Sequence, residues 1–190
     1  MKKILLVTSF AGSSGYIKAL LPILNSVLSV KILASGVGAD TLTRDGFQVD
    51  YRIENDSIEL EKVLDTVKPN LIFLVPQFGN SIEELTILKA KKRNIPCIAG
   101  IDHWGFYKER FSITNLSHVI VDDGFQLLPD LIIVNDRVAL NDAITEGIPS
   151  DLLVIGGNPL LEKRWHGFNF INNYENKGNN HSILFISEPY

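Results

Sequence analysis

The 190-residue sequence has a single cysteine, Cys97, which lies in the apolar run 95–99. One cysteine can form neither a disulfide within the chain nor a cysteine-based metal cluster. We therefore expect Cys97 to be a small buried residue of the core. The sequence also lacks the spacing of metal ligands, a P-loop and a nucleophile elbow. It therefore predicts neither a metal site nor a tightly held cofactor.

An excess of positive charge is also absent. The 18 lysines and arginines are outnumbered by 22 aspartates and glutamates, which gives a formal net charge of −4. Proteins that bind nucleic acid through its phosphates need clustered basic residues. The composition therefore predicts that the chain has no nucleic-acid partner.

Long hydrophobic runs are absent as well. The run Ile4–Val7 follows two lysines, but it is shorter than the roughly 7–15 apolar residues of a secretory signal. No stretch approaches the ~18–20 apolar residues that span a bilayer. We therefore expect a cytoplasmic protein, and the sequence leaves open a peripheral contact with a membrane surface.

What the sequence does contain is a regular alternation of short apolar runs and helical patterns. Most runs are continuous, which is typical of strands covered on both faces. The predicted strands are Ile4–Val7, Val30–Leu33, Val49–Ile53, Leu71–Val75, Cys97–Ile101, Val119–Val121, Leu131–Val134, Leu152–Ile155 and Ile183–Ile186. The predicted helices are Tyr16–Leu28, Ile58–Val67 capped by Ser57, Ile82–Arg93 capped by Ser81, and Val138–Glu146. This alternation predicts an α/β fold: a doubly wound, mostly parallel, Rossmann-like sheet with helices on both faces.

The amino-acid composition changes after Gly167. Residues 168–181 are rich in asparagine and predict a flexible linker, and the strong strand Ile183–Ile186 follows. A hydrophobic strand beyond a linker has no evident place in the first sheet and is an aggregation hazard by itself. We therefore expect a domain over 1–167, a linker over 168–181, and the start of a missing second domain over 182–190. The alternative is that the last strand folds back as an edge of the same sheet.

Candidate site residues follow the strands, because ligands of an open parallel sheet bind outside the carboxyl ends of its strands. After the first strand come Gly12, Ser13, Ser14 and Gly15, which open a helix. Glycine lets a ligand approach the backbone, and free N–H groups at a helix N-terminus favour an anion or a sugar hydroxyl. The third glycine of the dinucleotide fingerprint is missing. A simple tight turn is the alternative explanation.

The densest polar cluster follows the fifth strand of the predicted core. Asp102 and His103 could place a general base and its orienting group, although adjacent residues of an extended chain point to opposite sides. Trp104 offers a stacking face for a sugar or a base, and Arg110 offers a fork for a phosphate or a carboxylate. The alternative is that the aromatic residues here only cover the sheet.

Three further candidates lie at strand ends. Asn135 follows Leu131–Val134, Asn158 lies just beyond Leu152–Ile155, and Gln77 follows the strand that ends near Val75. We expect all three to contact the substrate, with Asn158 beside the cleft that a second domain would close.

Several segments occur in a distinctive order along the chain. They are Ser9–Gly15, Pro129–Asn135, Glu146–Pro149, Leu153–Pro159 and Ile183–Pro189. In this order the chain resembles the N-terminal half of GT-B-type glycosyltransferases and of the related UDP-GlcNAc 2-epimerases. The segment Leu153–Pro159 is similar to the V-x-G-N-P sequence that ends the first domain of several such enzymes, with Gly157 as an extra residue.

The resemblance implies an enzyme in which two Rossmann-like domains face each other across a cleft. In that superfamily the N-terminal domain binds the acceptor and often supplies the catalytic base, while the C-terminal domain holds most contacts to the nucleotide sugar. The chain is then expected to be the acceptor-binding half of a glycosyltransferase in surface polysaccharide or glycoconjugate synthesis. Its partners would be a nucleotide-sugar donor, a sugar or lipid-linked acceptor, and the missing C-terminal domain or a partner chain, without which it would be inactive.

Two alternatives stay open. One is an epimerase or hydrolase half-domain that acts on nucleotide sugars. The other is a non-catalytic module that binds a sugar or a nucleotide. In the leading hypothesis, Asp102 or His103 deprotonates the acceptor hydroxyl.

Overall fold

The computed structural model describes residues 1–77, 81–113 and 125–167. The predicted strands Val119–Val121 and Ile183–Ile186, the predicted linker 168–181 and the predicted second-domain segment 182–190 lie outside the described residues.

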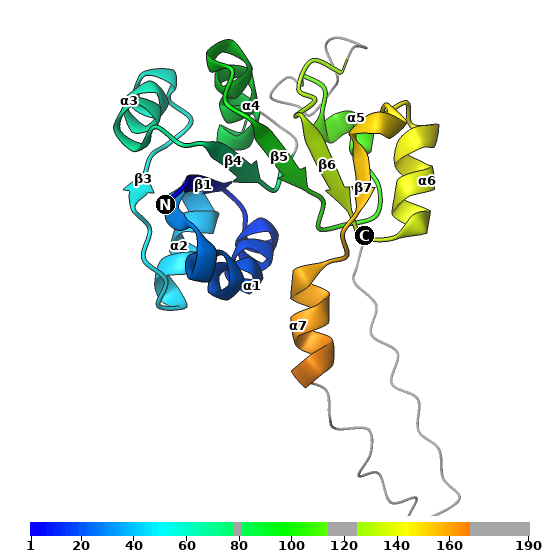
Figure 1. Cartoon of the computed structure of the whole chain (residues 1–190), viewed down its shortest axis with the longest axis horizontal. Coiled ribbons are helices and arrows are strands. Elements are labelled where there is room, and N and C mark those ends of the chain that lie inside the picture. The colour runs from blue at the N-terminus through cyan, green and yellow to red at the C-terminus, as the bar shows by residue number, and fades with distance from the viewer. Residues whose placement is uncertain (78–80, 114–124, 168–190) are drawn as a thin grey trace, which may run out of the picture.

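Within these ranges, seven parallel strands form one sheet in the order β3-β2-β1-β4-β5-β6-β7 (Figure 1). The strands are β1 (Lys3–Thr8), β2 (Ser29–Ala34), β3 (Tyr51–Arg52), β4 (Leu71–Leu74), β5 (Cys97–Gly100), β6 (Leu131–Val134) and β7 (Leu153–Ile155). The chain adds strands outward from β1 to β3, returns to the other side of β1, and adds β4 to β7 in the opposite direction. The topological switch point therefore lies between β1 and β4. The prediction of a doubly wound α/β sheet is confirmed.

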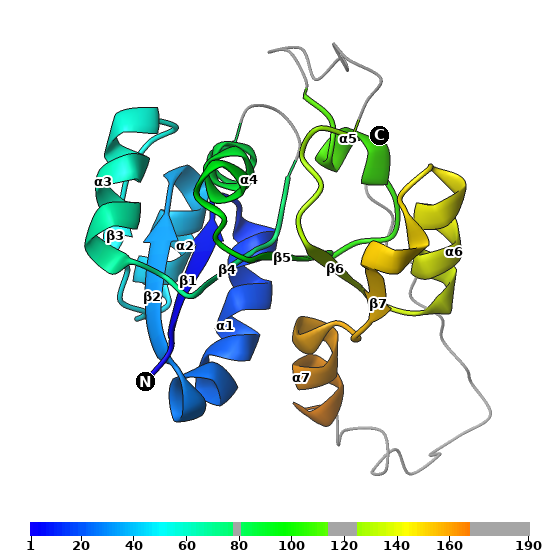
Figure 2. The same cartoon turned by 45° about the horizontal axis from the view of Figure 1, so that its top comes forward.

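Helices cover both faces of this sheet, as predicted (Figure 2). One face carries α1 (Ala11–Val27), α2 (Gly36–Arg44) and α7 (Pro159–Gly167), and the other carries α3 (Ser57–Val67), α4 (Ile82–Arg93), α5 (Tyr107–Arg110) and α6 (Arg137–Thr145). A short 3₁₀ turn over Ser150–Leu152 precedes β7.

The core has two halves, one on each face, because side chains alternate along every strand. In β1, Leu5 and Val7 pack under α3 and α4, whereas Ile4 and Leu6 pack under α1 and α2. Fully burying one such side chain stabilises the fold by roughly 1.5–3 kcal/mol. This double burial explains why the strand sequences are continuous apolar runs. Cys97 is buried in β5, as expected.

Two helix boundaries differ from the prediction. Helix α1 begins at Ala11 rather than Tyr16, so the glycine- and serine-rich segment after β1 is helical and not a loop. Its start lacks a polar cap at Phe10, but the Ser13 hydroxyl accepts a hydrogen bond from the Phe10 main-chain N–H at 3.2 Å. In α3, the carboxylate of Asp56 accepts from two main-chain N–H groups, so the predicted cap Ser57 is the first helical residue instead. The Ser81 cap of α4 is confirmed.

Three helices were not predicted, namely α2, α5 and α7. Helix α2 begins with Gly36 and Gly38, and glycine weakens a helix by about 1 kcal/mol relative to alanine. Helix α5 spans only four residues. Helix α7 is preceded by Asn158 and begins with Pro159, which are residues typical of a helix start. Its apolar residues lack a clear helical periodicity, so the helix was not predicted.

Candidate functional site

The candidate site lies at the carboxyl ends of β5, β6 and β7. Three of the predicted site residues are brought to this edge: Asp102 after β5, Asn135 after β6, and Asn158 after β7. The register places Gly100 beside Ile133 and Val134 beside Ile155, so the segments that follow the three strands start side by side.

Asp102 is the centre of this site, and its two carboxylate oxygens face different surroundings. Oδ1 lies 3.4 Å from Nη1 of Arg110. Oδ2 faces the first turn of α1, where a Cβ added to Gly12 would lie 3.1 Å from it. Asp102 therefore lies between the Arg110 guanidinium and the N-terminal turn of α1.

Arg110 is buried, with 5% of its surface exposed. Its Nη1 donates a hydrogen bond to the main-chain oxygen of Pro76 and lies beside Asp102, whereas its buried Nε has no hydrogen-bond partner among the described residues. Burial lowers the pKa of Arg110, and the negative charge of Asp102 opposes that change. The sequence suggested a fork for a ligand phosphate. The structure instead places this guanidinium inside the protein, where it joins the ends of β4 and β5.

Tyr16 of α1 is a member of this group that the sequence did not single out. Its ring is stacked on Phe73, with 6.0 Å between ring centroids, and it lies against Gly100. Burial, and then the nearby charge of Asp102, raise the pKa of Tyr16 to about 12, so the phenol stays protonated. In the sequence Tyr16 is one more apolar position on a helical face, and no signal separates it from core residues.

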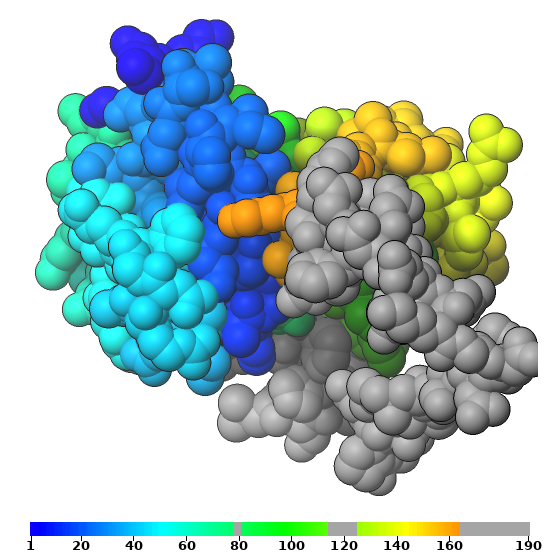
Figure 3. Space-filling view, turned by 90° about the horizontal axis from the view of Figure 1, so that it is seen from below, coloured from blue at the N-terminus to red at the C-terminus, as the bar shows by residue number. Residues whose placement is uncertain are grey.

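Asn158 joins the site to α7. Its side-chain Nδ2 donates to the main-chain oxygen of Asp102 at 3.1 Å, and its Oδ1 accepts from the N–H groups of Leu160 and Leu161. Asn158 is thus the N-cap of α7 and a tie between β5 and this helix. Helix α7 lies against α1 (Figure 3).

Trp104 and His103 turn outward from the same edge. The indole N–H of Trp104 donates to Asp136 at 2.9 Å, and 40% of the residue is exposed. Hydrogen bonds from the α6 main chain at Ala139 and then from Trp104 lower the pKa of Asp136. His103 is exposed, and its ring centroid lies 6.4 Å from that of Phe106. This loop therefore presents an immobilised aromatic face to solvent.

Two predicted residues lie near this group without a described hydrogen bond to it. Asn135 is buried, and within the part of the chain that the structure describes neither its side-chain nitrogen nor its oxygen has a hydrogen-bond partner. Gln77 is half-buried and directly follows Pro76, the residue that accepts from Arg110.

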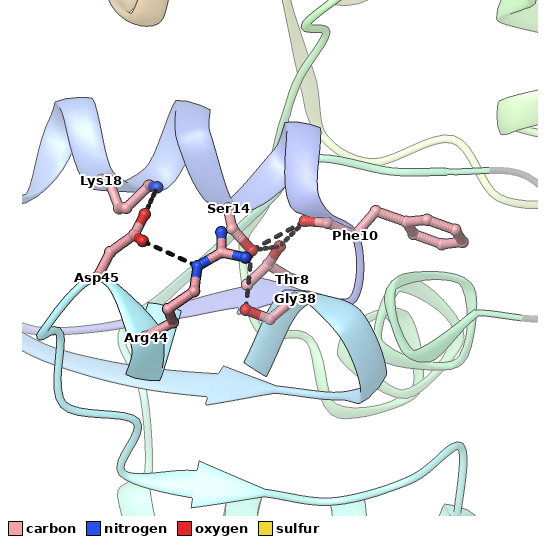
Figure 4. Close-up of polar contacts among 7 residues, drawn as sticks. All are labelled: Thr8, Phe10, Ser14, Lys18, Gly38, Arg44 and Asp45. Atoms are coloured by element: carbon pink, nitrogen blue, oxygen red, sulfur yellow. Dashed lines mark hydrogen bonds and ion pairs between the residues drawn. The ribbon is translucent and has the colours of Figure 1, made fainter. Parts of the chain in front are cut away.

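The serines after β1 are used inside the protein. Ser13 and Ser14 are fully buried, and both hydroxyls lie within hydrogen-bond distance of Thr8. The Ser14 hydroxyl also lies within hydrogen-bond distance of the main-chain oxygens of Phe10 and Gly38, at 2.8 and 3.1 Å (Figure 4). These bonds tie β1, α1 and α2 together. The ring of Phe10 points away from this network (Figure 4).

Glu83 is a second residue that the sequence did not single out. It lies in the first turn of α4 and is completely buried. Its carboxylate accepts a hydrogen bond from the Ser9 main-chain N–H at 2.7 Å and lies within hydrogen-bond distance of the Ser9 hydroxyl. Burial raises the pKa of Glu83, and its hydrogen bonds partly oppose that change. Nothing in the sequence distinguishes Glu83 from the exposed glutamates common in a first helical turn.

Two negative findings concern the described residues alone. No helix there is long and apolar enough to cross a membrane. Across residues 1–77, 81–113 and 125–167, no three histidine, cysteine or acidic side chains gather closely enough to hold a metal ion.

Comparison with known proteins gives a match in fold only. No protein-family model and no curated protein matches the chain. UDP-GlcNAc 2-epimerase from Neisseria meningitidis, in a structure bound to UDP-GlcNAc, matches with a TM-score of 0.61 and 15% identity, over 90% of this chain and 51% of that one. S. aureus MnaA, solved with UDP, matches with a TM-score of 0.62 and 19% identity, over 84% and 44%. Anabaena HepE in complex with UDP and glucose matches with a TM-score of 0.54 and 14% identity, over 83% and 45%.

The chain has the fold of a GT-B or epimerase-type domain. The resemblance noted in the sequence is thereby confirmed at the level of the fold. The chain spans about half the length of these structures, with coverages of 44–51%. In this fold, Asp102 and its neighbours lie at the strand ends where ligands of open α/β sheets bind.

Proposed function

We propose that the chain is the acceptor-binding half of a glycosyltransferase that uses a nucleotide-activated sugar. The observation that carries this proposal is the placement of Asp102. It lies between a buried guanidinium and the N-terminus of α1, at the ligand-bearing edge of a fold shared with proteins solved with UDP or UDP-sugars. A second domain, from a longer polypeptide or a partner chain, would form the other wall of the cleft.

Asp102 is the proposed general base. Oδ1 lies 3.4 Å from the Arg110 guanidinium, whereas Oδ2 faces the first turn of α1, so Oδ2 is the oxygen that would accept a proton from an acceptor hydroxyl. The exposed ring of Trp104, fixed by Asp136, would stack on the acceptor sugar. His103 has no comparable fixing contact to a charged group in the described residues, which favours Asp102 of the two candidates. The second wall would stabilise the leaving diphosphate.

The test is turnover of a nucleotide sugar such as UDP-GlcNAc by the longer polypeptide or the two-chain complex, with the 190-residue chain alone as the inactive reference. We expect Asp102→Asn to lower kcat by roughly 10²–10⁴-fold with a small change in the KM for the donor, which is the usual contribution of a general base. His103→Ala should stay within a few-fold of wild type. Wild-type turnover in Asp102→Asn would rule out the base assignment.

A matched pair of glycine variants tests the same point without replacing a charged residue. Gly12→Ala places a methyl group 3.1 Å from Oδ2 of Asp102, whereas Gly15→Ala places one 3.2 Å from the side chain of Leu160. Both replacements add helix propensity. We therefore expect both proteins to stay folded, and only Gly12→Ala to lower kcat strongly. Equal effects of the two variants would contradict the role of Asp102.

An epimerase is the second candidate, because UDP-GlcNAc 2-epimerases are among the structures that share this fold. Inversion at carbon 2 of the sugar breaks the bond between that carbon and its hydrogen. Product formed in D₂O would therefore carry deuterium at carbon 2, and no acceptor would be needed. A glycosyltransferase would leave carbon 2 unlabelled and would require an acceptor, so mass spectrometry of the product separates the two activities.

A further inference from the structure

Ser9 and Glu83 meet at the topological switch point. Ser9 directly follows β1, and Glu83 lies in the first turn of α4, which follows β4. Strands β1 and β4 are neighbours, but α1 and α4 leave them toward opposite faces of the sheet. Such a divergence opens the crevice in which open α/β sheets bind ligands. The pair thus lies across that crevice, at the edge of the sheet that also carries Asp102.

The geometry of the pair leaves part of the Ser9 hydroxyl available. The Ser9 N–H donates to Oε1 of Glu83 at 2.7 Å, and the hydroxyl oxygen lies 2.9 Å from Oε1 and 2.7 Å from Oε2. A hydroxyl has one hydrogen and two lone pairs. Glu83 is fully buried, whereas Ser9 is only half-buried. Ser9 can therefore contact Glu83 on its inner side and a ligand on its outer side.

The surroundings of Glu83 favour a neutral ligand. The groups acting on its carboxyl are the hydroxyls of Ser9 and Ser81 and the main-chain N–H groups of Ser9 and of Glu83 itself. None of the described lysines, arginines or histidines forms an ion pair with it. A phosphate placed beside Ser9 would gain no ion pair from the groups around Glu83, and it would be repelled whenever the Glu83 carboxyl is ionised. A ligand hydroxyl can instead donate to Ser9 or accept from it, whichever way the shared proton lies.

Phe10 supplies a second feature of a sugar site. It follows Ser9 directly and exposes 43% of its surface. Its ring points away from the serine network of α1 (Figure 4). Sugar rings combine hydroxyl groups with an apolar face of C–H groups, which suits a hydroxyl beside an exposed aromatic ring.

We propose that Ser9, backed by Glu83, is a hydroxyl-binding contact for a neutral sugar ring that packs on Phe10. This proposal rests on the proposed function for the choice of a sugar, and it adds a contact at the β1–β4 crevice to the Asp102 site.

The experiment follows the backbone amide resonances of the 190-residue chain while N-acetylglucosamine or inorganic phosphate is added. We expect the sugar to shift the amides of Ser9 and Phe10 saturably and phosphate to leave them unchanged. Ser9→Ala should weaken sugar binding about tenfold, which corresponds to one hydrogen bond of about 1.4 kcal/mol. The matched control is Ser26→Ala, which removes an exposed hydroxyl that donates to the Ile23 main-chain oxygen, and it should bind like wild type.

A second measurement uses the wild-type chain, so it does not depend on the folding of a serine variant. Sugar affinity should change with pH through the range in which Glu83 titrates, and Glu83→Gln should bind the sugar with a flat pH profile. A larger response of Ser9 to phosphate, no response to the sugar, or unchanged affinity in Ser9→Ala would each overturn the proposal. If the sugar shifts Trp104 but not Ser9, the Ser9 contact fails while the proposed function stands.

Discussion

At the scale of single residues, the contact between α1 and β5 depends on the missing side chain of Gly100. The aromatic rings of Tyr16 and Phe73 lie directly against this glycine. A Cβ at this position would lie 2.8 Å from Phe73 and 3.0 Å from Tyr16. Helix α1 carries Gly12 and Tyr16, so a change at Gly100 would move the groups that surround Asp102.

We expect Gly100→Ala to destabilise the protein by roughly 1–3 kcal/mol, the usual cost of overpacking a core. Urea unfolding measures this free energy. Replacing Phe73 by leucine removes the closest ring atom, so the double variant Gly100→Ala with Phe73→Leu should lose less than the sum of the two single effects. Additive effects would show that the contact with Phe73 is not the cause.

Arg110 and Asp102 should depend on each other. Arg110→Met leaves the largely buried Asp102 carboxylate without its cation, and breaking such a pair typically costs about 3–5 kcal/mol. Adding Asp102→Asn removes the charge that is left over, so the double variant should regain part of that stability. The check is the unfolding free energy of the two single variants and the double variant. A double variant weaker than Arg110→Met would contradict the pairing.

The sequence identifies some of these residues and not others, for physical reasons. Asp102 directly follows an apolar run and Asn158 lies three residues beyond another, so the rule for strand ends finds them. The burial of Arg110 could not be predicted from the residues next to it. It depends on a contact with Pro76, which is distant in the sequence, and on one with Asp102, which lies across a turn. The partnership of Glu83 with Ser9 joins residues 74 positions apart and leaves no local pattern.

At the scale of elements, α7 is held at its start by one side chain. Asn158 caps the helix with its oxygen and reaches Asp102 with its nitrogen. We expect Asn158→Ala to lose both contacts, at about 0.5–2 kcal/mol for the cap, and Asn158→Ser to retain a capping group. Hydrogen exchange of the α7 amides should therefore speed up more in Asn158→Ala than in Asn158→Ser. Equal exchange in the two variants would mean that the cap does not stabilise α7.

Elements with long apolar periodicity are the ones that the sequence predicts. Helices α3, α4 and α6 were expected within one or two residues, because each buries a regular stripe on the sheet. Helix α2 is short and begins with two glycines, so its formation depends on packing of Ala39 and Leu42 against the sheet. Tertiary contacts of this kind outweigh local propensity, and a sequence read residue by residue does not contain them.

At the scale of the whole molecule, the fold class followed from general rules, whereas no strand order was predicted. Continuous apolar runs indicated a sheet covered on both faces, and alternating helices indicated parallel crossovers. The sequence did not show that the β1–β4 crevice is bridged by a buried acid. That feature has a consequence for the stability of the entire fold, because a buried carboxyl group couples folding to pH.

Glu83 should make the protein less stable as the pH rises. Burial raises its pKa in the folded state above the ordinary value of 4.5, so the folded protein holds a proton that the unfolded chain releases. Its contribution is therefore fully present below about pH 4.5 and is lost as the pH rises through the folded pKa, with a slope of up to about 1.4 kcal/mol per pH unit. Asp45, Asp56 and Asp136 have lowered pKa values and act oppositely, since their contribution is lost as the pH falls.

The difference between Glu83→Gln and wild type isolates this effect, because the other groups titrate alike in both proteins. We expect the unfolding free energy of Glu83→Gln to gain on wild type steadily from pH 5 upward, measured by urea unfolding at a series of pH values. Glu59→Gln is the matched control for the loss of a first-turn glutamate, since Glu59 lies exposed in the first turn of α3. A flat curve for Glu83→Gln would mean that Glu83 is ionised in the folded protein as readily as in the unfolded chain. The Ser9 contacts would then fully offset the unfavourable burial of its charge.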